Sequence, residues 1–293
     1  ERVVAARETA NGAVAEILHA DGTRSERACD ILVGADGIHS ALRQQFHPDE
    51  GAPRWNGMMM WRGTTLARPF LDGRTMVQAG HRRAKFVVYP IEPVRPDGLQ
   101  RINWICDRRL REDGFGGGLT APSREDWSKP GSLDDLLPTF GSWRFAWLDV
   151  PGLIRAAEQI LEWPMVDRDP LPRWRHGHTT LLGDAAHPMY PIGSNGATQA
   201  ILDAAALADA LDGHASITAA LNAYEAARLP MTRDIVAMNR REGLDAILDM
   251  VEEAAPEGFA RIEDVTDPTV LAEWVQAYKK AAGHQVARPQ AAS

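Results

Sequence analysis

The stretch Leu181-Leu182-Gly183-Asp184-Ala185-Ala186-His187-Pro188, continued by Pro191-Ile192-Gly193-Ser194-Asn195-Gly196, decides the fold. Residues 179–182 are β-branched and apolar, which predicts a buried strand. Residues 197–211 repeat small apolar side chains at helical spacing, which predicts an alanine-rich helix. The glycine-rich loop between them lets backbone approach a ligand closely and leads it to a helix N-terminus with unpaired N–H groups. That arrangement suits an anion or an electron-rich ring.

A second strand-and-turn segment lies upstream, at Ile31-Leu32-Val33-Gly34-Ala35-Asp36-Gly37, and Ser40 and Arg43 follow it. Either turn alone is weak evidence, because Asp-Gly and Gly-Asp turns occur in many proteins. Two such turns in this order, each at the carboxyl end of an apolar strand, are hard to produce by chance.

The two segments together resemble the second and third flavin motifs of the single-component, FAD-dependent aromatic hydroxylases. These are the class A flavoprotein monooxygenases, typified by para-hydroxybenzoate and salicylate hydroxylases. Further stretches are similar to the branch that includes the phenazine-modifying flavin monooxygenases: Met60-Trp61-Arg62-Gly63, Phe70-Leu71-Asp72-Gly73, Tyr89-Pro90-Ile91 and Pro164-Met165-Val166-Asp167-Arg168-Asp169-Pro170. The resemblance covers nearly the whole chain, from about Gly12 to Tyr278.

The resemblance implies an FAD site. It places residues 34–43 near the FAD pyrophosphate, whereas residues 183–195 hold the ribityl chain through the aspartate and cradle the ring through the glycine loop. Backbone N–H groups at a helix start would stabilise the negative charge that a reduced flavin carries on its N1/O2 edge. The expected cofactor-binding residues are Asp36, Gly37, Arg43, Gly183, Asp184, Pro191, Gly193, Ser194, Asn195 and Gly196.

Four of these residues have alternative interpretations. Asp36 either contacts the cofactor or mainly holds the turn with Gly37. Ser194 or Asn195 also suits an ordinary helix N-cap, which is compatible with the cofactor role. Arg43 is expected to contact pyrophosphate or a carboxylate rather than to catalyse a step.

Trp61, Arg62, Trp104 and Tyr190 are the candidate substrate residues. An aromatic platform with one cation suits a planar carboxylated aromatic, although sheet packing with a surface arginine is the commoner arrangement. We assign no catalytic residue, because a histidine in a turn, such as His187, more often packs or donates one orienting hydrogen bond. We predict no metal, because no Cys, Asp or Glu cluster completes a site with His176 and His178.

The implied reaction is hydroxylation of a small aromatic substrate, carboxylated or phenazine-like. The cofactor is FAD, and the co-substrates are O2 and either NADH or NADPH. The resemblance implies that oxygen is transferred through a flavin C4a-hydroperoxide. The alternatives are a related flavin oxidoreductase (an epoxidase, dehydrogenase or halogenase) and, in another class, a catalytically inactive fragment that binds no flavin.

The expected fold is α/β, with an incomplete FAD/NAD(P)-binding domain. Residues 1–48 and 167–238 form that domain, residues 49–166 a mixed or antiparallel-sheet substrate domain, and residues 239–293 a helical C-terminal segment. No Gly-x-Gly-x-x-Gly follows a strand and opens a helix, and Gly114-Phe115-Gly116-Gly117-Gly118 is typical of a flexible loop. The chain also begins without Met, so we expect a fragment that is inactive on its own.

Local patterns predict the remaining elements. Asn11-Gly12 between two apolar runs predicts a hairpin or meander. Glycine and proline separate four runs of an antiparallel sheet, at residues 58–66, 75–79, 85–89 and 101–106. Helices are predicted at residues 133–140 with Ser132 as cap, 153–157, 217–238 with an interruption near Pro230, and 267–282, and a strand at 160–166.

The composition, 44% hydrophobic and 25% charged over 293 residues, is that of an ordinary soluble globular chain. A net charge of −8 and an isoelectric point of about 5.6 argue against nucleic acid as a partner. No stretch of 18 apolar residues suggests a membrane span, and no signal peptide is visible. Cys29 and Cys106 lack metal or redox spacing and are expected to be reduced, which fits a cytoplasmic location.

Overall fold

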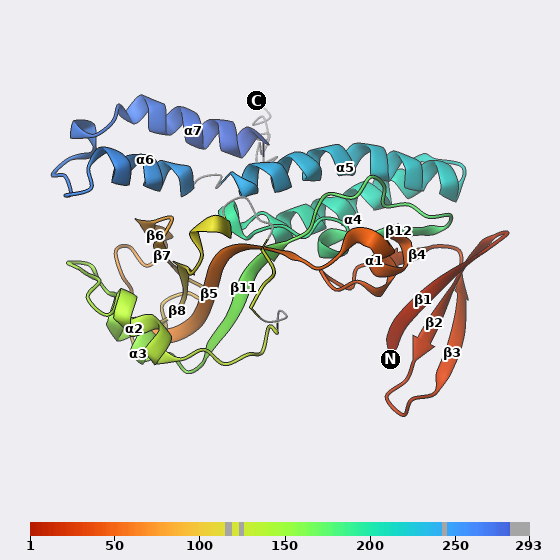
Figure 1. The fold of residues 1–293 in the computed structure, drawn as a ribbon, viewed down its shortest axis with the longest axis horizontal. Helices are drawn as coiled ribbons and strands as arrows, with labels where there is room; N and C mark the ends of the chain where they lie inside the picture. Colours follow the sequence, from red (N-terminus) through yellow and green to blue (C-terminus); the bar gives the residue numbers. More distant parts are fainter. Residues whose placement is uncertain (115–118, 123–125, 242–244, 282–293) are drawn as a thin grey trace. The chain divides into compact units, whose positions relative to one another are not determined.

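The computed structural model describes residues 1–114, 119–122, 126–241 and 245–281. The chain divides into two compact units (Figure 1). Unit 1 comprises residues 1–54, 166–244 and 272–293, and unit 2 comprises residues 55–165 and 245–271. Most of the predicted glycine loop at 114–118 and the last residue of the predicted helix at 267–282 lie outside the described residues.

Unit 1 begins with an antiparallel meander of three strands, β1 (Arg2–Thr9), β2 (Gly12–Leu18) and β3 (Arg24–Cys29). Thr9 pairs with Gly12 across a two-residue turn, so the predicted turn lies where β1 meets β2. Of the two arrangements left open by the sequence, the structure has the meander.

A short parallel pair joins the two turns that the sequence singles out. Strand β4 (Leu32–Gly34) pairs in parallel with β12 (Thr179–Leu181), with Gly34 opposite Leu181. Since parallel strands end at the same edge of a sheet, the turns after β4 and β12 lie side by side. Helix α1 (Ala41–Phe46) follows the first turn, and the Ser40 hydroxyl caps it by accepting from the Arg43 amide at 3.1 Å.

Two long helices follow β12 and pack against the strand pair. They are α4 (Gly196–Gly213) and α5 (Ile217–Arg240), and the core between these elements includes Leu181, Leu221 and Tyr224. The Tyr224 hydroxyl donates to the Leu181 carbonyl at 3.0 Å, which ties α5 to β12.

The predicted interruption of α5 near Pro230 is wrong, because α5 is one helix through this residue. An interior proline removes a hydrogen bond and costs about 3 kcal/mol. Buried side chains on both sides of Pro230, among them Leu229, Thr232 and Ile235, hold the two halves in one helix and offset that cost.

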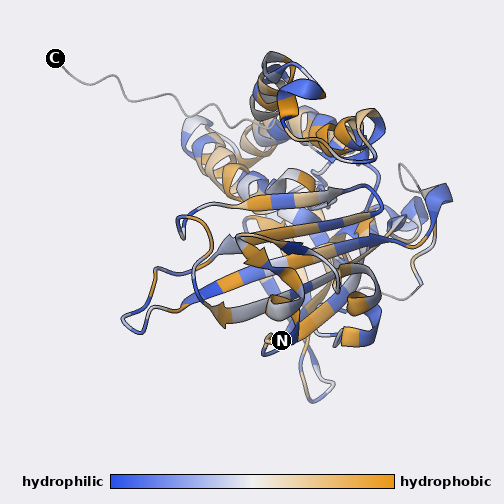
Figure 2. Cartoon of the chain, turned by 90° about the vertical axis from the view of Figure 1, so that its left-hand side faces the viewer, coloured by the Kyte–Doolittle hydropathy of each residue, from blue (hydrophilic) through white to orange (hydrophobic). Residues whose placement is uncertain are grey.

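Unit 2 is built on a five-stranded sheet with the order β11-β5-β8-β7-β6. The pairs β5–β8, β8–β7 and β7–β6 are antiparallel, as predicted. Hydrophobic and hydrophilic residues both occur along the strands (Figure 2), which is the pattern of sheets whose two faces differ. The strand bounds are β5 (Arg54–Ala67), β6 (Val77–His81), β7 (Ala84–Pro90), β8 (Gln100–Arg109) and β11 (Ile160–Asp167).

Helices α2 (Leu133–Phe140) and α3 (Val150–Arg155) cover one face of this sheet. Phe140 contacts Phe86, and the Thr65 hydroxyl donates to the Leu153 carbonyl at 2.8 Å. Ser132 caps α2 as predicted. Helix α3 begins three residues earlier than predicted, because Asp149 accepts from the Gly152 amide and Pro151 suits a first turn.

Helix α6 (Ala246–Ala254) was not predicted from the sequence. The N-cap residue Asp245 pairs with Lys85 on β7, and Asp249 accepts from the Arg82 amide at 2.8 Å. The smaller elements are η1 (Pro48–Glu50), η2 (Glu112–Gly114), β9 (Arg144–Phe145), β10 (Leu148–Asp149), η3 (Gly183–Ala185), η4 (Ile192–Ser194), η6 (Ile262–Asp264) and α7 (Pro268–Ala281).

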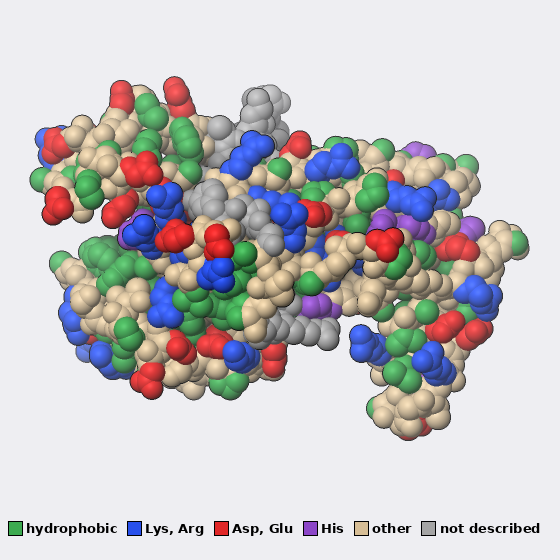
Figure 3. Space-filling view, in the orientation of Figure 1, with side chains coloured by type: hydrophobic (Ala, Val, Ile, Leu, Met, Phe, Trp, Pro, Cys, Tyr) green, Lys and Arg blue, Asp and Glu red, His purple; other side chains and the backbone are tan. Residues whose placement is uncertain are grey.

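Charged side chains of both signs are interspersed on the face drawn in Figure 3. Among the described residues, no helix combines the length and the apolar composition that a membrane span requires.

Candidate functional site

The turn after β12 carries an open carboxylate. Gly183 adopts a φ of 60°, and its carbonyl accepts from the amides of Ala186 and His187 at 2.8 and 2.9 Å, which closes the turn. Asp184 is exposed and has no hydrogen-bond or ion-pair partner among the described residues. Desolvation by the surrounding protein still raises the pKa of the Asp184 carboxyl, and His187 opposes part of that rise.

The loop before α4 has the backbone that close approach to a ligand requires. Gly193 has a φ of 73° and Ser194 a φ of 57°, a region that side chains rarely adopt outside constrained sites. Asn195 is the N-cap of α4, but its buried side chain makes no capping hydrogen bond. Asn195 therefore does not cap α4 through its side chain.

These features fit the ribityl and ring portions of FAD. An unpartnered carboxylate at a strand end can accept from a ribityl hydroxyl. Gly196, the first residue of α4, has open space around its Cα, with Asp184 Oδ1 at 3.9 Å from a Cβ built there. The carboxylate and the helix start therefore face the same space, and Pro191 lies in the loop that leads to it.

A fully buried aspartate fastens this turn to α4 and α5. Asp203 Oδ2 accepts from the Gly183 amide at 3.0 Å and from His187 Nε2 at 2.5 Å, and Oδ1 accepts from Arg228 Nε at 2.7 Å. Arg228 also donates to the Gln199 side chain at 2.6 Å. Burial raises the pKa of the Asp203 carboxyl, but these donors outweigh burial and hold the pKa below its ordinary value.

His187 has the orienting role rather than the acid–base role. It is buried against Trp174, with ring centroids 5.5 Å apart, and its Nε2 faces Asp203. Because the Asp203 carboxylate accepts, the proton lies on Nε2. Nδ1 is buried and has no hydrogen-bond partner among the residues that the structure describes.

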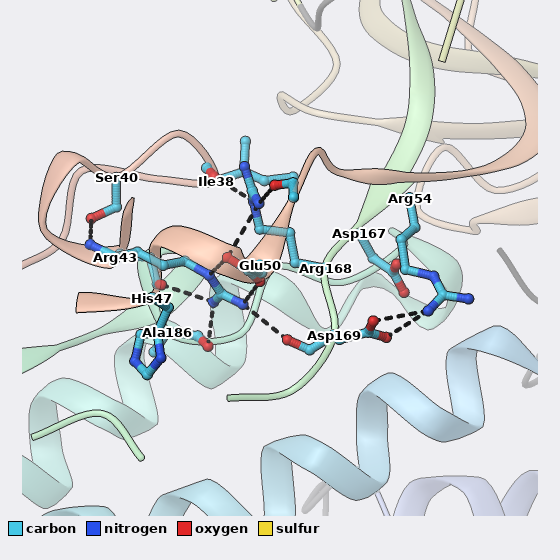
Figure 4. A network of polar contacts seen from close by, with 12 residues as sticks. Ile38, Ser40, Arg43, His47, Glu50, Arg54, Asp167, Arg168, Asp169 and Ala186 are labelled. Atoms are coloured by element: carbon cyan, nitrogen blue, oxygen red, sulfur yellow. Dashed lines mark hydrogen bonds and ion pairs between the residues drawn. The ribbon is translucent and has the colours of Figure 1, made fainter. Parts of the chain in front are cut away.

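Arg43 contacts a carboxylate, and the pyrophosphate contact expected as its alternative does not fit its geometry. Its side chain is 1% exposed and points into the protein behind α1. It makes a two-point ion pair with Glu50 and donates to the carbonyls of Ala185, Ala186 and Asp169 (Figure 4). All five N–H donors of the guanidinium are then engaged by protein, so Arg43 joins the two turns and has no donor left for a cofactor.

Asp169 extends this network toward the end of α5. Its carboxylate accepts from Arg54 at 2.8 and 3.0 Å and from Arg240 at 2.7 Å, and Arg240 also holds the buried Asp167 through two hydrogen bonds. Burial raises the pKa of Asp167, and Arg240 opposes that rise. For Asp169 the two arginines outweigh burial and lower the pKa.

Tyr190 is a buried part of this framework. Its hydroxyl donates to the Arg54 carbonyl at 3.3 Å, and its own carbonyl accepts from Asn239 Nδ2 at 3.0 Å. Burial and the neighbouring Asp167 raise the pKa of the Tyr190 phenol. Since the side chain is 1% exposed, Tyr190 holds the segment before Pro191.

In unit 2, the three other substrate candidates do not form one platform. The register places Trp61 and Trp104 on the sheet face that α2 and α3 cover, where both are buried, and Arg62 on the opposite face. Trp61 Nε1 donates to Glu162 at 2.9 Å, and Trp104 Nε1 to Thr65 at 3.1 Å. The cation over the Trp61 ring is Arg108, at 5.4 Å, so the two tryptophans pack the sheet.

Arg62 is exposed and keeps free donors. Its Nε donates to Asn103 Oδ1 at 2.6 Å, which fixes the plane of the guanidinium. Its two terminal nitrogens have no partner among the described residues. Asn103 is fully buried and its Nδ2 has no hydrogen bond within the described part of the chain, so its amide is held in place by packing on this face of the sheet.

Asp36 and the remaining histidines make local contacts. Asp36 Oδ2 accepts from the Ala41 amide at 2.8 Å, and Gly37 has a φ of 81° with open space around it. His176 Nε2 faces His47 Nε2 at 3.3 Å, whereas His178 contacts Glu8. No group of three metal-ligating side chains occurs in the part of the chain that the structure describes.

Sequence reasoning missed Asp203, Arg228, Asn103 and Arg240. Asp203 and Arg228 lie inside predicted helices, where a charge is usually solvated. One signal could have revealed Asp203. It lies on the same face of the alanine-rich helix as the core residues Leu207 and Ala210, and a buried aspartate needs hydrogen-bond donors. Asn103 gave no signal beyond its place in a strand.

Comparisons with known proteins point to one family. Residues 151–239 match a family described as an FAD binding domain. A phenazine 1,6-dicarboxylic acid hydroxylase, PhzS, from Lysobacter antibioticus is 49% identical over 211 residues, which cover 71% of this chain and 50% of that protein. Salicylate hydroxylase from Pseudomonas putida is 29% identical, over 75% of this chain and 52% of that protein.

Solved structures agree on the fold. The Klebsiella pneumoniae protein HpxO, complexed with FAD and uric acid, matches with a TM-score of 0.63 and 24% identity, over 96% of this chain and 62% of that one. A salicylate hydroxylase substrate complex matches with a TM-score of 0.64 and 22% identity, over 98% of this chain and 71% of that one. The chain spans about half the length of the curated relatives named above.

Proposed function

We propose that this chain, which belongs to the FAD-dependent aromatic hydroxylases (class A flavoprotein monooxygenases), forms part of a monooxygenase that hydroxylates an aromatic carboxylate. The observation that carries the flavin assignment is the closeness of two groups: the Asp184 carboxylate, which has no partner among the described residues, and the start of α4, where the Asn195 side chain makes no capping hydrogen bond. NADH or NADPH and O2 are the co-substrates of this proposal.

The residues of unit 1 would hold the ribityl chain and the ring. Asp184 accepts from a ribityl hydroxyl, and the loop of Gly193, Ser194, Asn195 and Gly196 brings backbone N–H groups to the flavin edge. FAD supplies the electron transfer and oxygen activation that protein side chains lack. The protein's own contributions are position, a positive helix end and exclusion of water. Pro191 and Gly183 shape the backbone on either side.

Unit 2 would recognise the substrate, through Arg62. An arginine fixed at Nε and open at both terminal nitrogens presents the parallel donors that a carboxylate accepts. The printed names of several relatives carry the same group: a phenazine dicarboxylic acid, an aminohydroxybenzoate and salicylate. We therefore favour a planar aromatic acid over an aromatic without an acidic group.

The test uses the whole gene product that carries this chain. Purified protein is examined for flavin absorbance near 450 nm and for NAD(P)H oxidation stimulated by a panel of aromatic acids and their carboxamides. We expect bound FAD, oxidation stimulated by an acid but not its amide, and one hydroxylated product per NAD(P)H. Substrate oxidation without oxygen incorporation would indicate a dehydrogenase, and protein without flavin would overturn the assignment.

Arg62→Met separates substrate recognition from flavin binding. Loss of a two-point ion pair costs about 2–3 kcal/mol, so KM for the acid should rise by roughly 30- to 150-fold while FAD content stays normal. Arg68→Met is the matched control, because Arg68 is exposed shortly after β5 and has no partner among the described residues. An unchanged KM in Arg62→Met would remove Arg62 from the substrate site.

A further inference from the structure

We propose that Asp203 is a positioning residue of the flavin site, which fixes the turn that carries Asp184. The proposal rests on the proposed function, because Asp184 matters here as the carboxylate that receives the ribityl chain. Asp203 itself is fully buried on α4, so it would act through this turn and not by contact with a cofactor.

Asp203 holds the Asp184 turn at both ends. Its Oδ2 accepts from the amide of Gly183, which directly precedes Asp184, and from the side chain of His187, three residues after it. The amides of Ala186 and His187 close the same turn on the Gly183 carbonyl. Asp184 is therefore the open position of a segment whose two ends are attached to one carboxylate.

A second charged residue fixes the carboxylate in turn. Arg228 on α5 donates from Nε to Asp203 Oδ1 at 2.7 Å and reaches the Gln199 side chain and carbonyl on α4. The Asp203 carboxylate belongs to α4, and its plane is thus fixed by the Arg228 cation on α5. The geometry transmits the packing of α4 against α5 to the turn after β12.

The site requires an anion rather than a neutral amide. Three donors (the Gly183 amide, His187 Nε2 and Arg228 Nε) converge on the two oxygens of Asp203. An asparagine has one acceptor oxygen, so it must leave either the Gly183 amide or Arg228 without an acceptor. Asp203→Asn therefore frees one end of the turn without changing the size of the side chain.

This role differs from ordinary structural support in one measurable way. If Asp203 acts on FAD through Asp184, then removing Asp184 removes the effect of Asp203 on FAD affinity. A residue that only stabilises the fold weakens FAD binding by the same factor whether or not Asp184 is present, or does not weaken it at all.

The experiment is a double-mutant cycle of FAD affinity on the whole gene product, with Asp203→Asn, Asp184→Ala and the double variant. We expect Asp203→Asn to raise the Kd for FAD about tenfold and Asp184→Ala at least as much. The double variant should bind FAD as Asp184→Ala does. Asp209→Asn is the matched control, because Asp209 is an exposed aspartate of the same helix, and its Kd should equal that of the wild type.

A multiplicative double variant, or an Asp203→Asn protein with wild-type Kd, overturns the positioning role and leaves the flavin assignment intact. Wild-type protein that binds no FAD overturns both. If Asp203→Asn does not fold, Arg228→Lys replaces it in the cycle, since lysine keeps the charge but loses the paired donors to Asp203 and Gln199. Its weakening of FAD binding should likewise vanish in the Asp184→Ala background, and persistence there counts against the proposal.

Discussion

Asp184 lies in the turn after β12 and Asp203 holds that turn from α4, but the protein completes the hydrogen bonding of Asp203 only. Asp203 receives three donors and is fully buried, whereas Asp184 has no partner among the described residues and faces solvent. The pKa values of the two carboxyls shift in opposite directions. At Asp203 the three donors outweigh burial and lower the pKa, whereas at Asp184 the surrounding protein partly desolvates the carboxyl and raises its pKa. The saturated carboxylate supports the fold, and the open one is available for a ligand.

The arginines repeat this difference. Arg43 uses all its donors on Glu50 and three carbonyls, whereas Arg62 uses one on Asn103 and keeps its terminal nitrogens open. Residue type and motif predicted cofactor or substrate contact for both. In the structure the two arginines differ in how many of their N–H donors already have an acceptor in the protein.

Arg43→Met should have the largest effect on stability. It leaves the Glu50 carboxylate, whose side chain is 12% exposed, with Arg168 alone and releases three carbonyls, and breaking a largely buried pair of this kind typically costs about 3–5 kcal/mol. Urea unfolding of the whole gene product measures the loss. Arg7→Met is the control, because the exposed pair of Arg7 with Glu26 contributes at most about 1 kcal/mol. Equal losses in the two variants would mean that Arg43 is not the structural residue described here.

Asp203→Asn and Asp184→Asn should affect stability unequally. Asp203→Asn leaves one buried donor unsatisfied, so it should lower the free energy of unfolding by roughly 1–3 kcal/mol. Asp184→Asn removes a partly desolvated charge without breaking a hydrogen bond, so stability without FAD should be unchanged or slightly higher. Both are read from urea unfolding of apoprotein. A loss of stability in Asp184→Asn would show that Asp184 has a partner in the folded protein, which contradicts the difference drawn here between Asp184 and Asp203.

Local patterns made much of the flavin turn predictable. The apolar run at β12, the helical spacing of α4 and the turn residues between them are all short-range signals, and the structure has each element within one or two residues of its expected bounds. The same holds for α2, whose cap is the neighbouring Ser132.

Long-range partners were not predictable. The acceptors of Arg43 come from η1, from the turn after β12 and from the end of β11, and no local pattern brings these segments together. The start of α6 within the predicted helical segment was not predictable, because its N-cap Asp245 is paired with Lys85 on the distant strand β7. Arg62 and Trp61 are adjacent in sequence, but strand alternation puts them on opposite faces, which breaks the predicted platform.

The pH dependence of stability should separate the same two aspartates. The pKa of Asp203 is lowered in the folded protein, so its stabilising effect is present above the unfolded value of about 3.9 and is lost as pH falls through the lower folded pKa. The deficit of Asp203→Asn should therefore be full at pH 6 and shrink below about pH 4.

Asp184 has the opposite sign. Its folded pKa is raised, so folding favours the protonated carboxyl, and its contribution is full below about pH 3.9 and is lost as pH rises through the folded pKa. Relative to wild-type apoprotein, Asp184→Asn should gain stability as pH rises from about 4 to 7. Urea midpoints at pH values across this range test both trends, and parallel curves for the two variants would contradict the assignment of opposite shifts.

The smallest effect is expected at Asp36, whose hydrogen bonding is intermediate between that of Asp203 and that of Asp184. One of its oxygens accepts from the Ala41 amide at 2.8 Å, and the other has no partner among the described residues. If Asp36 mainly holds the turn before α1, Asp36→Ala should cost about 0.5–1.5 kcal/mol, whereas Asp36→Asn retains an acceptor and should stay within about 0.5 kcal/mol of the wild type. Because Asp36 is already half satisfied, FAD affinity should change less than in Asp184→Ala for both variants. FAD binding weakened by Asp36→Asn as strongly as by Asp184→Ala would place Asp36 with the open carboxylates, on the cofactor.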